Sequence, residues 1–166
     1  MEQMAFEQLN RECTSCVFTG HRELGEEFTS KTEKTLKAEI ERLINLGVTN
    51  FYCGMAMGFD LLAAEKVLSW KKKYPSVKLI ACLPCEEQEK YFSLKDKKRY
   101  AKILKKSDEV LLLSNVYYKG CMLARDRYMA DRADCMIAYC RKQTGGTAYT
   151  VKYFQKKKPY APIIYL

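Results

Sequence analysis

Long hydrophobic runs are absent from this chain of 166 residues. Its apolar stretches are short, such as residues 110–113, whereas a membrane-spanning helix needs about 20 apolar residues. The first residues, MEQMAFEQLN, also lack the basic start and apolar core of a signal peptide. We therefore expect a cytoplasmic protein with no membrane partner, folded as one domain over residues 1–166, with residues 1–11 as an N-terminal extension.

Two glycine-based fingerprints of nucleotide-binding enzymes are absent as well. No G-x-G-x-x-G follows the first apolar segment, and no Walker A lysine motif occurs anywhere in the chain. These absences disfavour nicotinamide or flavin oxidoreductases and P-loop NTPases. The chain has only one histidine, His21, which lies in a glycine-containing stretch, VFTGHRELG.

The sequence contains eight cysteines, which we interpret as free thiols because no export signal precedes them. Two C-x-x-C pairs, Cys13 with Cys16 and Cys82 with Cys85, have the spacing of zinc ligands. However, Cys13 opens one predicted strand and Cys82 closes another, and these points lie at opposite ends of a parallel sheet. We expect buried small side chains there and no metal. The order of elements also disfavours a thioredoxin-like redox pair.

Apolar, β-branched segments alternate with helical patterns along the whole chain. Strands are predicted at residues 13–19, 50–54, 78–83, 109–114, 135–140 and 163–166. Helices are predicted at residues 30–46, 61–73, 121–133 and 146–157, with one broken helix or two short ones at 86–106. A capping box of Ser30 and Glu33 is predicted to open the first of these helices.

This alternation predicts an α/β fold with three layers, α/β/α, around a mostly parallel sheet of five to six strands. The nearly continuous apolar strands are typical of strands that are covered on both faces. Such sheets bind ligands outside the carboxyl ends of their strands, where the strand order reverses. The loops at that edge are therefore the first place to look for function.

The net charge is +9, from 29 basic and 20 acidic residues. Many lysines occur where predicted helices end, at residues 71–73, 102, 105, 106 and 156–158. Cations at these positions offset the negative end of the helix dipole, and these helix ends lie at the amino edge of the sheet. We therefore interpret most of the basic excess as helix-end compensation rather than as a nucleic-acid-binding patch.

Three glycine-containing loops follow predicted strands: TGHR at residues 19–22, GMAMGFD at 54–60 and TGGT at 144–147. The second and third run directly into helices. Glycine lets backbone N–H groups approach a ligand closely, and the unpaired N–H groups of a helix start attract phosphate. The three loops together predict an anion-binding site at the carboxyl edge.

Five segments, in chain order, carry a family resemblance: FTGHR, GMAMGFD, LPCEEQE, RDRYMADRADCMIAY and GGTAYT. They resemble the YpsA-like (DUF1273) branch of the SLOG superfamily, which is related to the LOG phosphoribohydrolases and to the domain of DNA processing protein A. The resemblance extends from residue 13 to residue 166. It implies a Rossmann-like sheet that binds a nucleotide or an ADP-ribose-like molecule.

The candidate ligand-binding positions, of which the resemblance implies all except Thr19, Met55 and Arg127, are Thr19, Gly20, His21, Arg22, Gly54, Met55, Gly58, Asp60, Arg125, Arg127, Gly145, Gly146 and Thr147. Arg125, four residues before Met129, matches the arginine of the LOG pattern R-K-x-x-M. The catalytic glutamate of the LOG pattern PGGxGTxxE is missing, because Tyr149 and Thr150 occupy the corresponding region.

Several of these side chains have two interpretations. His21 either contacts the ligand or is an exposed loop imidazole. Asp60 either caps the helix that follows it or holds a ribose hydroxyl or a metal. Thr147 is either a hydroxyl at a helix start or a phosphate donor.

The same holds for side chains from the second half of the chain. Arg125 and Arg127 either bind phosphate or lie on a helix surface, where Arg127 could pair with Asp131. Tyr117 and Tyr118, in the loop after the fourth strand, either stack on a base or pack against the protein.

The leading hypothesis is a binding module that captures a nucleotide or an ADP-ribose-like molecule, for example as a sensor. The alternative is a hydrolase that acts on a nucleotide's N-glycosidic or phosphate bond, with His21, Arg125 and Asp60 nearest the chemistry. A third hypothesis is single-stranded nucleic acid binding. The sequence establishes no cofactor beyond a nucleotide-type ligand and leaves a homo-oligomer open.

Overall fold

The computed structural model describes residues 13–166, and the expected N-terminal extension, residues 1–11, lies outside the described residues. Within the described range the chain forms six strands and five helices. The strands are β1 (Ser15–Gly20), β2 (Asn50–Cys53), β3 (Lys78–Leu83), β4 (Glu109–Leu112), β5 (Cys135–Tyr139) and β6 (Ile163–Tyr165). The helices are α2 (Ser30–Asn45), α3 (Phe59–Lys71), α4 (Leu94–Lys106), α5 (Cys121–Arg132) and α6 (Gly146–Lys157), with a short 3-10 helix, η1 (Gln88–Tyr91), before α4.

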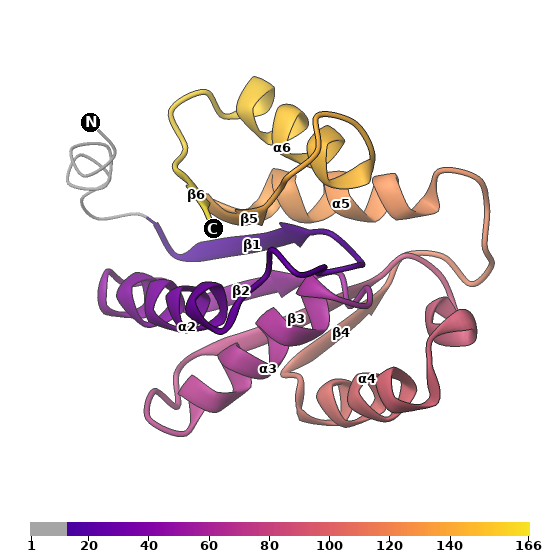
Figure 1. The fold of residues 1–166 in the computed structure, drawn as a ribbon, viewed down its shortest axis with the longest axis horizontal. Helices are drawn as coiled ribbons and strands as arrows, with labels where there is room; N and C mark the ends of the chain where they lie inside the picture. The colour runs from indigo at the N-terminus through magenta and orange to yellow at the C-terminus, as the bar shows by residue number, and fades with distance from the viewer. Residues whose placement is uncertain (1–12) are drawn as a thin grey trace.

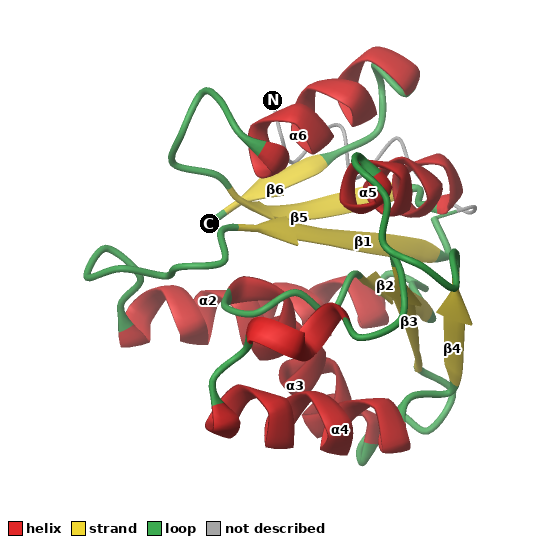
Figure 2. Ribbon diagram, turned by 90° about the vertical axis from the view of Figure 1, so that its right-hand side faces the viewer, coloured by secondary structure: helices red, strands yellow, loops and turns green. Residues whose placement is uncertain are grey.

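All six strands are parallel and form one sheet in the order β4-β3-β2-β1-β5-β6. Helices α2, α3 and α4 cover one face of the sheet, and α5 and α6 cover the other (Figure 1, Figure 2). The predicted three-layer α/β fold is therefore confirmed. The strand order reverses between β1 and β5, which makes this pair the switch point of the sheet.

Side chains of the central strands alternate between two hydrophobic cores. In β1, Phe18 faces the core under α2 and α3, whereas Val17 faces the core under α5 and α6. The Phe18 ring stacks on Phe51 of β2, with ring centroids 5.8 Å apart. Burial on both faces explains why these strands are nearly continuously apolar.

The register of β1 against β5 brings two loops together at the carboxyl edge. Gly20, the last residue of β1, pairs with Tyr139, the last residue of β5. The loops that follow these strands therefore start side by side. The start of α3 and the start of α5 lie at the same edge, because each helix follows a parallel strand.

The edge strand β4 corrects one expectation. Val110 is 46% exposed and Leu112 is 42% exposed, so β4 is not covered on both faces. It is the outermost strand of the sheet, whereas α5 and α6 pack on strands nearer the centre, β1, β3 and β5. An apolar sequence pattern does not distinguish an edge strand from a central one.

The cap of one helix and the start of another differ from the prediction. Thr29, not Ser30, is the N-cap of α2: its backbone is extended, and its hydroxyl accepts a hydrogen bond from the Thr32 N–H at 3.3 Å. Helix α3 begins at Phe59 with Gly58 as its N-cap, so Asp60 lies inside the first turn rather than at the cap.

The amino edge of the sheet shows how one of the helix-end lysines is used. The Lys158 ammonium donates hydrogen bonds to the carbonyl oxygens of Ala130, at 3.0 Å, and Asp131, at 2.9 Å, and also to that of Ala133. These carbonyls belong to the last turn of α5 and the residue that follows it. Lys158 therefore has the helix-end role expected from the charge pattern.

All eight cysteines are free thiols, and all are buried except the half-buried Cys13 and Cys140. Within residues 13–166, no group of three or more His, Cys, Asp or Glu side chains is arranged to hold a metal ion. In the same range, no helix combines the length and the apolar character needed to cross a membrane.

Candidate functional site

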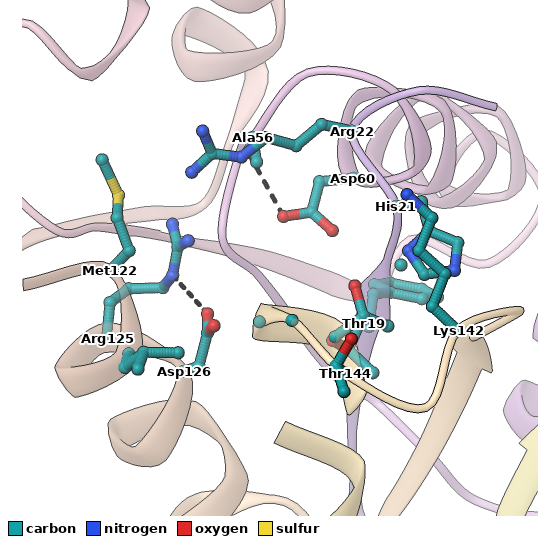
Figure 3. A pocket seen from close by; sticks show the side chains of 16 residues that line it. Thr19, His21, Arg22, Ala56, Asp60, Met122, Arg125, Asp126, Lys142 and Thr144 are labelled. Atoms are coloured by element: carbon teal, nitrogen blue, oxygen red, sulfur yellow. Dashed lines mark hydrogen bonds and ion pairs between the residues drawn. The ribbon is translucent and has the colours of Figure 1, made fainter. Parts of the chain in front are cut away.

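A cavity of about 260 Å³ opens at the carboxyl ends of β1 and β5, and we call it the switch-point cavity (Figure 3). Four segments line it: the end of β1 with the loop after it, the loop from β2 into α3, the first turns of α5, and the loop from β5 into α6. Of the residues expected at the site, it brings together Thr19, Gly20, His21, Arg22, Asp60, Arg125, Gly145, Gly146 and Thr147.

Gly20 allows the end of β1 to pack against α3. A Cβ atom at Gly20 would lie 2.3 Å from the Phe59 ring, so only glycine fits at this point. The Phe59 N–H also donates to the His21 carbonyl oxygen at 3.1 Å. The loop after β1 is thus held against the start of α3.

Gly58 packs against the backbone of the same loop after β1. Its φ of +77° lies in the left-handed region that favours glycine, and a Cβ there would lie 2.2 Å from the Arg22 carbonyl oxygen. Gly58 does not line the cavity. Its role in the structure is to let the backbones of two loops come together.

Arg125 enters the cavity wall from α5 and is held by hydrogen bonds on two sides. Its Nε donates to Asp126 Oδ1 at 2.7 Å, and its Nη1 donates to the Gly54 carbonyl oxygen and to Gln88 Oε1, the latter at 3.2 Å. The side chain is only 4% exposed. In the described part of the chain, Nη2 of Arg125 has no protein partner, so the N–H groups of Nη2 are available to a ligand.

Gly54 and Met55 lie behind Arg125 rather than in the cavity wall. A Cβ at Gly54 would lie 2.7 Å from Cζ of Arg125, so the absence of a side chain makes room for the guanidinium. Met55 is fully buried in the hydrophobic core, with a positive φ of 60°. Gly54 positions the arginine, Met55 is a residue of the hydrophobic core, and neither lines the cavity.

Asp60 points into the cavity from the first turn of α3 (Figure 3). Its Oδ2 accepts a hydrogen bond from the Ala56 N–H at 3.2 Å. Burial raises the pKa of this carboxyl from 3.8 to about 7, although Arg125 opposes the shift. Near neutral pH, Asp60 is therefore balanced between its neutral and its charged form.

Asp126 connects Arg125 to α6. One carboxylate oxygen accepts from Arg125, and the other accepts from the Thr150 hydroxyl at 3.2 Å. The same hydroxyl lies 2.8 Å from the Gly146 carbonyl oxygen. Thr150 thus joins the first turn of α6 to the carboxylate that orients the arginine.

His21 connects the loop after β1 to the loop after β5. Its Nε2 accepts a hydrogen bond from the Arg141 N–H at 2.7 Å, and its ring lies edge-on to Tyr139, with centroids 5.7 Å apart. Burial lowers the pKa of the imidazole, and the cations Lys142 and Arg141 lower it further. His21 is therefore a neutral imidazole with Nε2 as the acceptor, and it lines the cavity.

The start of α6 presents backbone donors to the cavity. Its first helical hydrogen bond runs from Tyr149 N to Gly145 O at 2.9 Å, so the N–H groups of the first turn have no partner within the helix. A Cβ at Gly145 would meet nothing within 4 Å, and one at Gly146 would meet only Leu123 at 3.9 Å. Unlike Gly20 and Gly58, these glycines leave open space in front of the donors.

Arg127 lies outside the cavity. It points from α5 toward α6, where its Nη1 donates to the Tyr149 hydroxyl at 3.0 Å. The expected pairing with Asp131 is not the one observed, because the Asp131 carboxylate accepts from the Tyr153 hydroxyl at 2.8 Å. The helix-surface interpretation of Arg127 is the one that the geometry favours.

The expected set of site residues left out several residues of the cavity wall, of which Ala56 and Thr144 lie in loops that the sequence did single out: Phe18, Ala56, Met122, Leu123, Asp126, Lys142 and Thr144. Lys142 lies in the same loop after β5, two residues before the TGGT segment, so the full length of that loop indicates it as well. Asp126 adjoins Arg125 in the sequence. Met122 and Leu123 follow β4, far from the switch point along the sheet, and only the path of the chain into α5 places them there.

The fold and this cavity define a Rossmann-like α/β protein with its candidate site at the switch point of a parallel sheet. The model of the YpsA family, described as "YspA SLOG family", matches residues 16–164. The chain therefore belongs to the YpsA-type SLOG family, as the sequence segments indicated.

Curated relatives come from bacteria. The chain is 27% identical over 133 residues to a UPF0398 protein of Halalkalibacterium halodurans, a match that covers 78% of this chain and 70% of the relative. It is 29% identical over 139 residues to the SPbeta prophage-derived protein YoqJ of Bacillus subtilis, which covers 76% of this chain and 81% of the relative.

Two solved structures of DNA processing protein A share the fold. The Helicobacter pylori protein, whose structure is described for its single-stranded DNA binding mode, superposes with a TM-score of 0.65 at 18% identity, over 98% of this chain and 67% of that chain. The Streptococcus pneumoniae protein superposes with a TM-score of 0.64 at 17% identity, over 92% of this chain and 50% of that chain.

Proposed function

We propose that this protein binds the phosphate-bearing part of a nucleotide, or of a nucleotide-derived molecule such as ADP-ribose, in the switch-point cavity. The observation that carries the proposal is the convergence of three kinds of anion-binding group on one small cavity. They are the backbone donors at the start of α6, the guanidinium Nη2 of Arg125, and the side chains of Arg22 and Lys142.

The charge balance of the cavity supports an anionic ligand. Arg22, Arg125 and Lys142 are cations, whereas Asp126 is paired with Arg125 and Asp60 has a pKa of about 7. The walls therefore carry a positive excess at neutral pH, and it increases when Asp60 is protonated. Membership of the SLOG family and the fold shared with DNA processing protein A are consistent with a nucleotide-type ligand.

A thermal-shift experiment with AMP, ADP and ADP-ribose tests this proposal. A ligand present at about 100 times its dissociation constant should stabilise the protein by about 2.7 kcal/mol. The variant Lys142→Ala should lose most of the stabilisation, whereas Lys34→Ala, an exposed lysine on α2 outside the cavity, should keep it. Absence of stabilisation by all three compounds would contradict the proposal.

Nucleotide hydrolysis is the second candidate function, and the environment of the Asp60 carboxyl is the observation that favours it. A buried carboxyl with a pKa of about 7 is suited to general acid or base catalysis near neutral pH, and it lies in the same cavity as Arg125. Product analysis of the incubated nucleotides tests this candidate. Turnover that Asp60→Asn abolishes would support hydrolysis. Recovery of unchanged nucleotides would contradict hydrolysis and leave ligand binding as the function of the cavity.

Single-stranded nucleic acid binding is the third candidate, favoured by the fold shared with the DNA-binding protein of Helicobacter pylori. It requires oligonucleotide binding that weakens steeply with salt, because phosphate contacts release counterions. No binding at low salt would remove this candidate.

A further inference from the structure

A second cavity of about 780 Å³ adjoins the switch-point cavity, and the two share Arg22 and Met122 as walls. It lies between the segment after β3 and the loop after β4. Its lining includes Cys85, Tyr91, Phe92, Val116 and Tyr117, and we call it the aromatic groove after its aromatic side chains.

Two of the three aromatic side chains that line this groove, Tyr91 and Tyr117, are largely exposed to solvent. Tyr91 is 87% exposed, Tyr117 is 68% exposed, and Val116, beside Tyr117 in the loop after β4, is 68% exposed. Single exposed hydrophobic residues are common on protein surfaces, but several that line one cavity indicate a binding surface. Tyr91, Tyr117 and Val116 belong to neither hydrophobic core, whereas Phe92 packs against the core under α2 and α3.

The sizes of the two cavities point to one ligand that extends across both. The switch-point cavity, at about 260 Å³, is smaller than typical small-molecule sites of roughly 300–1,000 Å³. The adjoining groove of about 780 Å³ supplies the missing space and differs in character. The first cavity offers cations and backbone donors, whereas the groove offers flat aromatic surface.

The charges of the groove argue against a second phosphate. Its two carboxylates, Glu86 and Glu87, balance its two cations, Lys90 and the shared Arg22, so the groove lacks the positive excess of the switch-point cavity. A phosphodiester backbone would be repelled by these carboxylates, whereas the amino group of a base could donate hydrogen bonds to them. The Asn115 side chain adds an amide that can pair with a base edge.

We propose that the aromatic groove binds the base of a mononucleotide-type ligand, by stacking on Tyr117 and Tyr91, while the phosphate end lies in the switch-point cavity. This inference rests on the proposed function, because it uses the phosphate end to fix the position of the base. The inference favours a mononucleotide with an amino-bearing base, such as adenine, over a strand of nucleic acid as the ligand. The two tyrosines would then set the preference for nucleotides over simple sugar phosphates.

Calorimetric titration with AMP and with ribose 5-phosphate tests the inference, because the two compounds differ only in the base. The wild-type protein should bind AMP more tightly, and Tyr117→Ala should weaken AMP binding about tenfold, as expected for the loss of a base–aromatic stack. Ribose 5-phosphate binding should change less than about twofold. Tyr160→Ala is the matched control, since Tyr160 is 94% exposed and lines neither cavity.

The outcomes separate this inference from the proposal on which it rests. Equal affinity for AMP and ribose 5-phosphate, or an AMP preference that survives in the double variant with Tyr91→Ala and Tyr117→Ala, would overturn the groove as a base site while leaving the phosphate site in place. Failure of both compounds to bind would overturn the proposed function, and the base site with it. Tight, salt-dependent oligonucleotide binding that both tyrosine substitutions weaken would show that a strand, and not a mononucleotide, occupies the groove.

Discussion

Arg125 of α5 and Gly54 after β2 meet across 71 positions of sequence: the guanidinium donates through Nη1 to the Gly54 carbonyl oxygen and fills the space that a side chain on Gly54 would need. This contact ties helix α5 to the loop that follows β2. It also fixes the orientation in which Nη2 of Arg125 remains available to a ligand.

Gly54→Ala should therefore act on the site through Arg125. The new methyl group would lie 2.7 Å from Cζ of a guanidinium that three hydrogen bonds hold in place, so the arginine must shift. We expect weaker binding of ADP-ribose by calorimetry and a loss of about 1–2 kcal/mol in unfolding free energy by urea denaturation. Gly146→Ala is the stability control, because its Cβ would meet only Leu123 at 3.9 Å. Unchanged affinity in Gly54→Ala would contradict the positioning role.

Asp126→Asn should destabilise the protein more than Thr150→Val does. The first removes the charge that pairs with the buried Arg125, a change that costs about 3 kcal/mol, whereas the second removes one neutral donor, worth about 1 kcal/mol. Urea denaturation of both variants measures the difference. Equal effects would show that the ion pair contributes no more than the hydroxyl contact.

Asp60 should make ligand binding depend on pH around neutrality. Its pKa of about 7 in the folded protein lies above the ordinary value of 3.8, so Asp60 is neutral below about pH 7 and negative above it. The affinity for ADP-ribose should therefore fall as the pH rises through 7, and Asp60→Asn should flatten the profile. ADP-ribose is the suitable probe because its pyrophosphate, unlike a phosphate monoester with a second pKa of about 6, does not change charge in this range. An unchanged pH profile in Asp60→Asn would assign the dependence to another group.

The same carboxyl affects stability with a defined sign. Between pH 3.8 and about 7 the folded protein binds more protons at Asp60 than the unfolded chain does, so this group's contribution to the unfolding free energy decreases as the pH rises across that window. Comparison of urea denaturation at several pH values for the wild type and Asp60→Asn isolates the contribution. A wild-type stability that rises more steeply with pH than that of the variant would contradict the assignment.

His21 should show the opposite pH dependence. Its pKa in the folded protein is below 6.5, so the unfolded chain binds more protons there, and its contribution to stability is present above pH 6.5 and is lost as the pH falls toward the folded pKa. Protonation would place a proton on Nε2 and remove the hydrogen bond from the Arg141 N–H. NMR titration of the imidazole should give a midpoint below 6.5, and a midpoint above that value would contradict the neutral acceptor.

The sequence predicted the layers, the parallel sheet and nearly all of its elements, because buried strands and amphipathic helices leave distinct patterns. It misplaced two caps: Thr29 lies beside Ser30, a residue of similar capping preference, and Gly58 caps α3 with no side-chain hydrogen bond that the sequence could signal. It also treated β4 as a covered strand, because apolar content does not report position in the sheet.

The glycines show why the site was harder to predict than the fold. Gly54, Gly58 and Gly145 look alike in the sequence, yet the first makes room for an arginine, the second for a neighbouring backbone, and only the third faces open space. Which of these roles a glycine has depends on what the fold places within 3 Å of it. Met122 and Leu123 were missed for the same reason, since their place in the cavity wall is set by the path from β4 into α5.

The most direct test of the anion site uses the fact that the chain has one histidine, which lines the cavity. Its imidazole signals in an NMR spectrum can be assigned to His21 without further labelling. Titration with ADP-ribose should shift these signals in a saturable manner and raise the pKa of His21, because an anion beside the ring stabilises the imidazolium. Signals and pKa that stay unchanged at millimolar AMP and millimolar ADP-ribose would contradict the account.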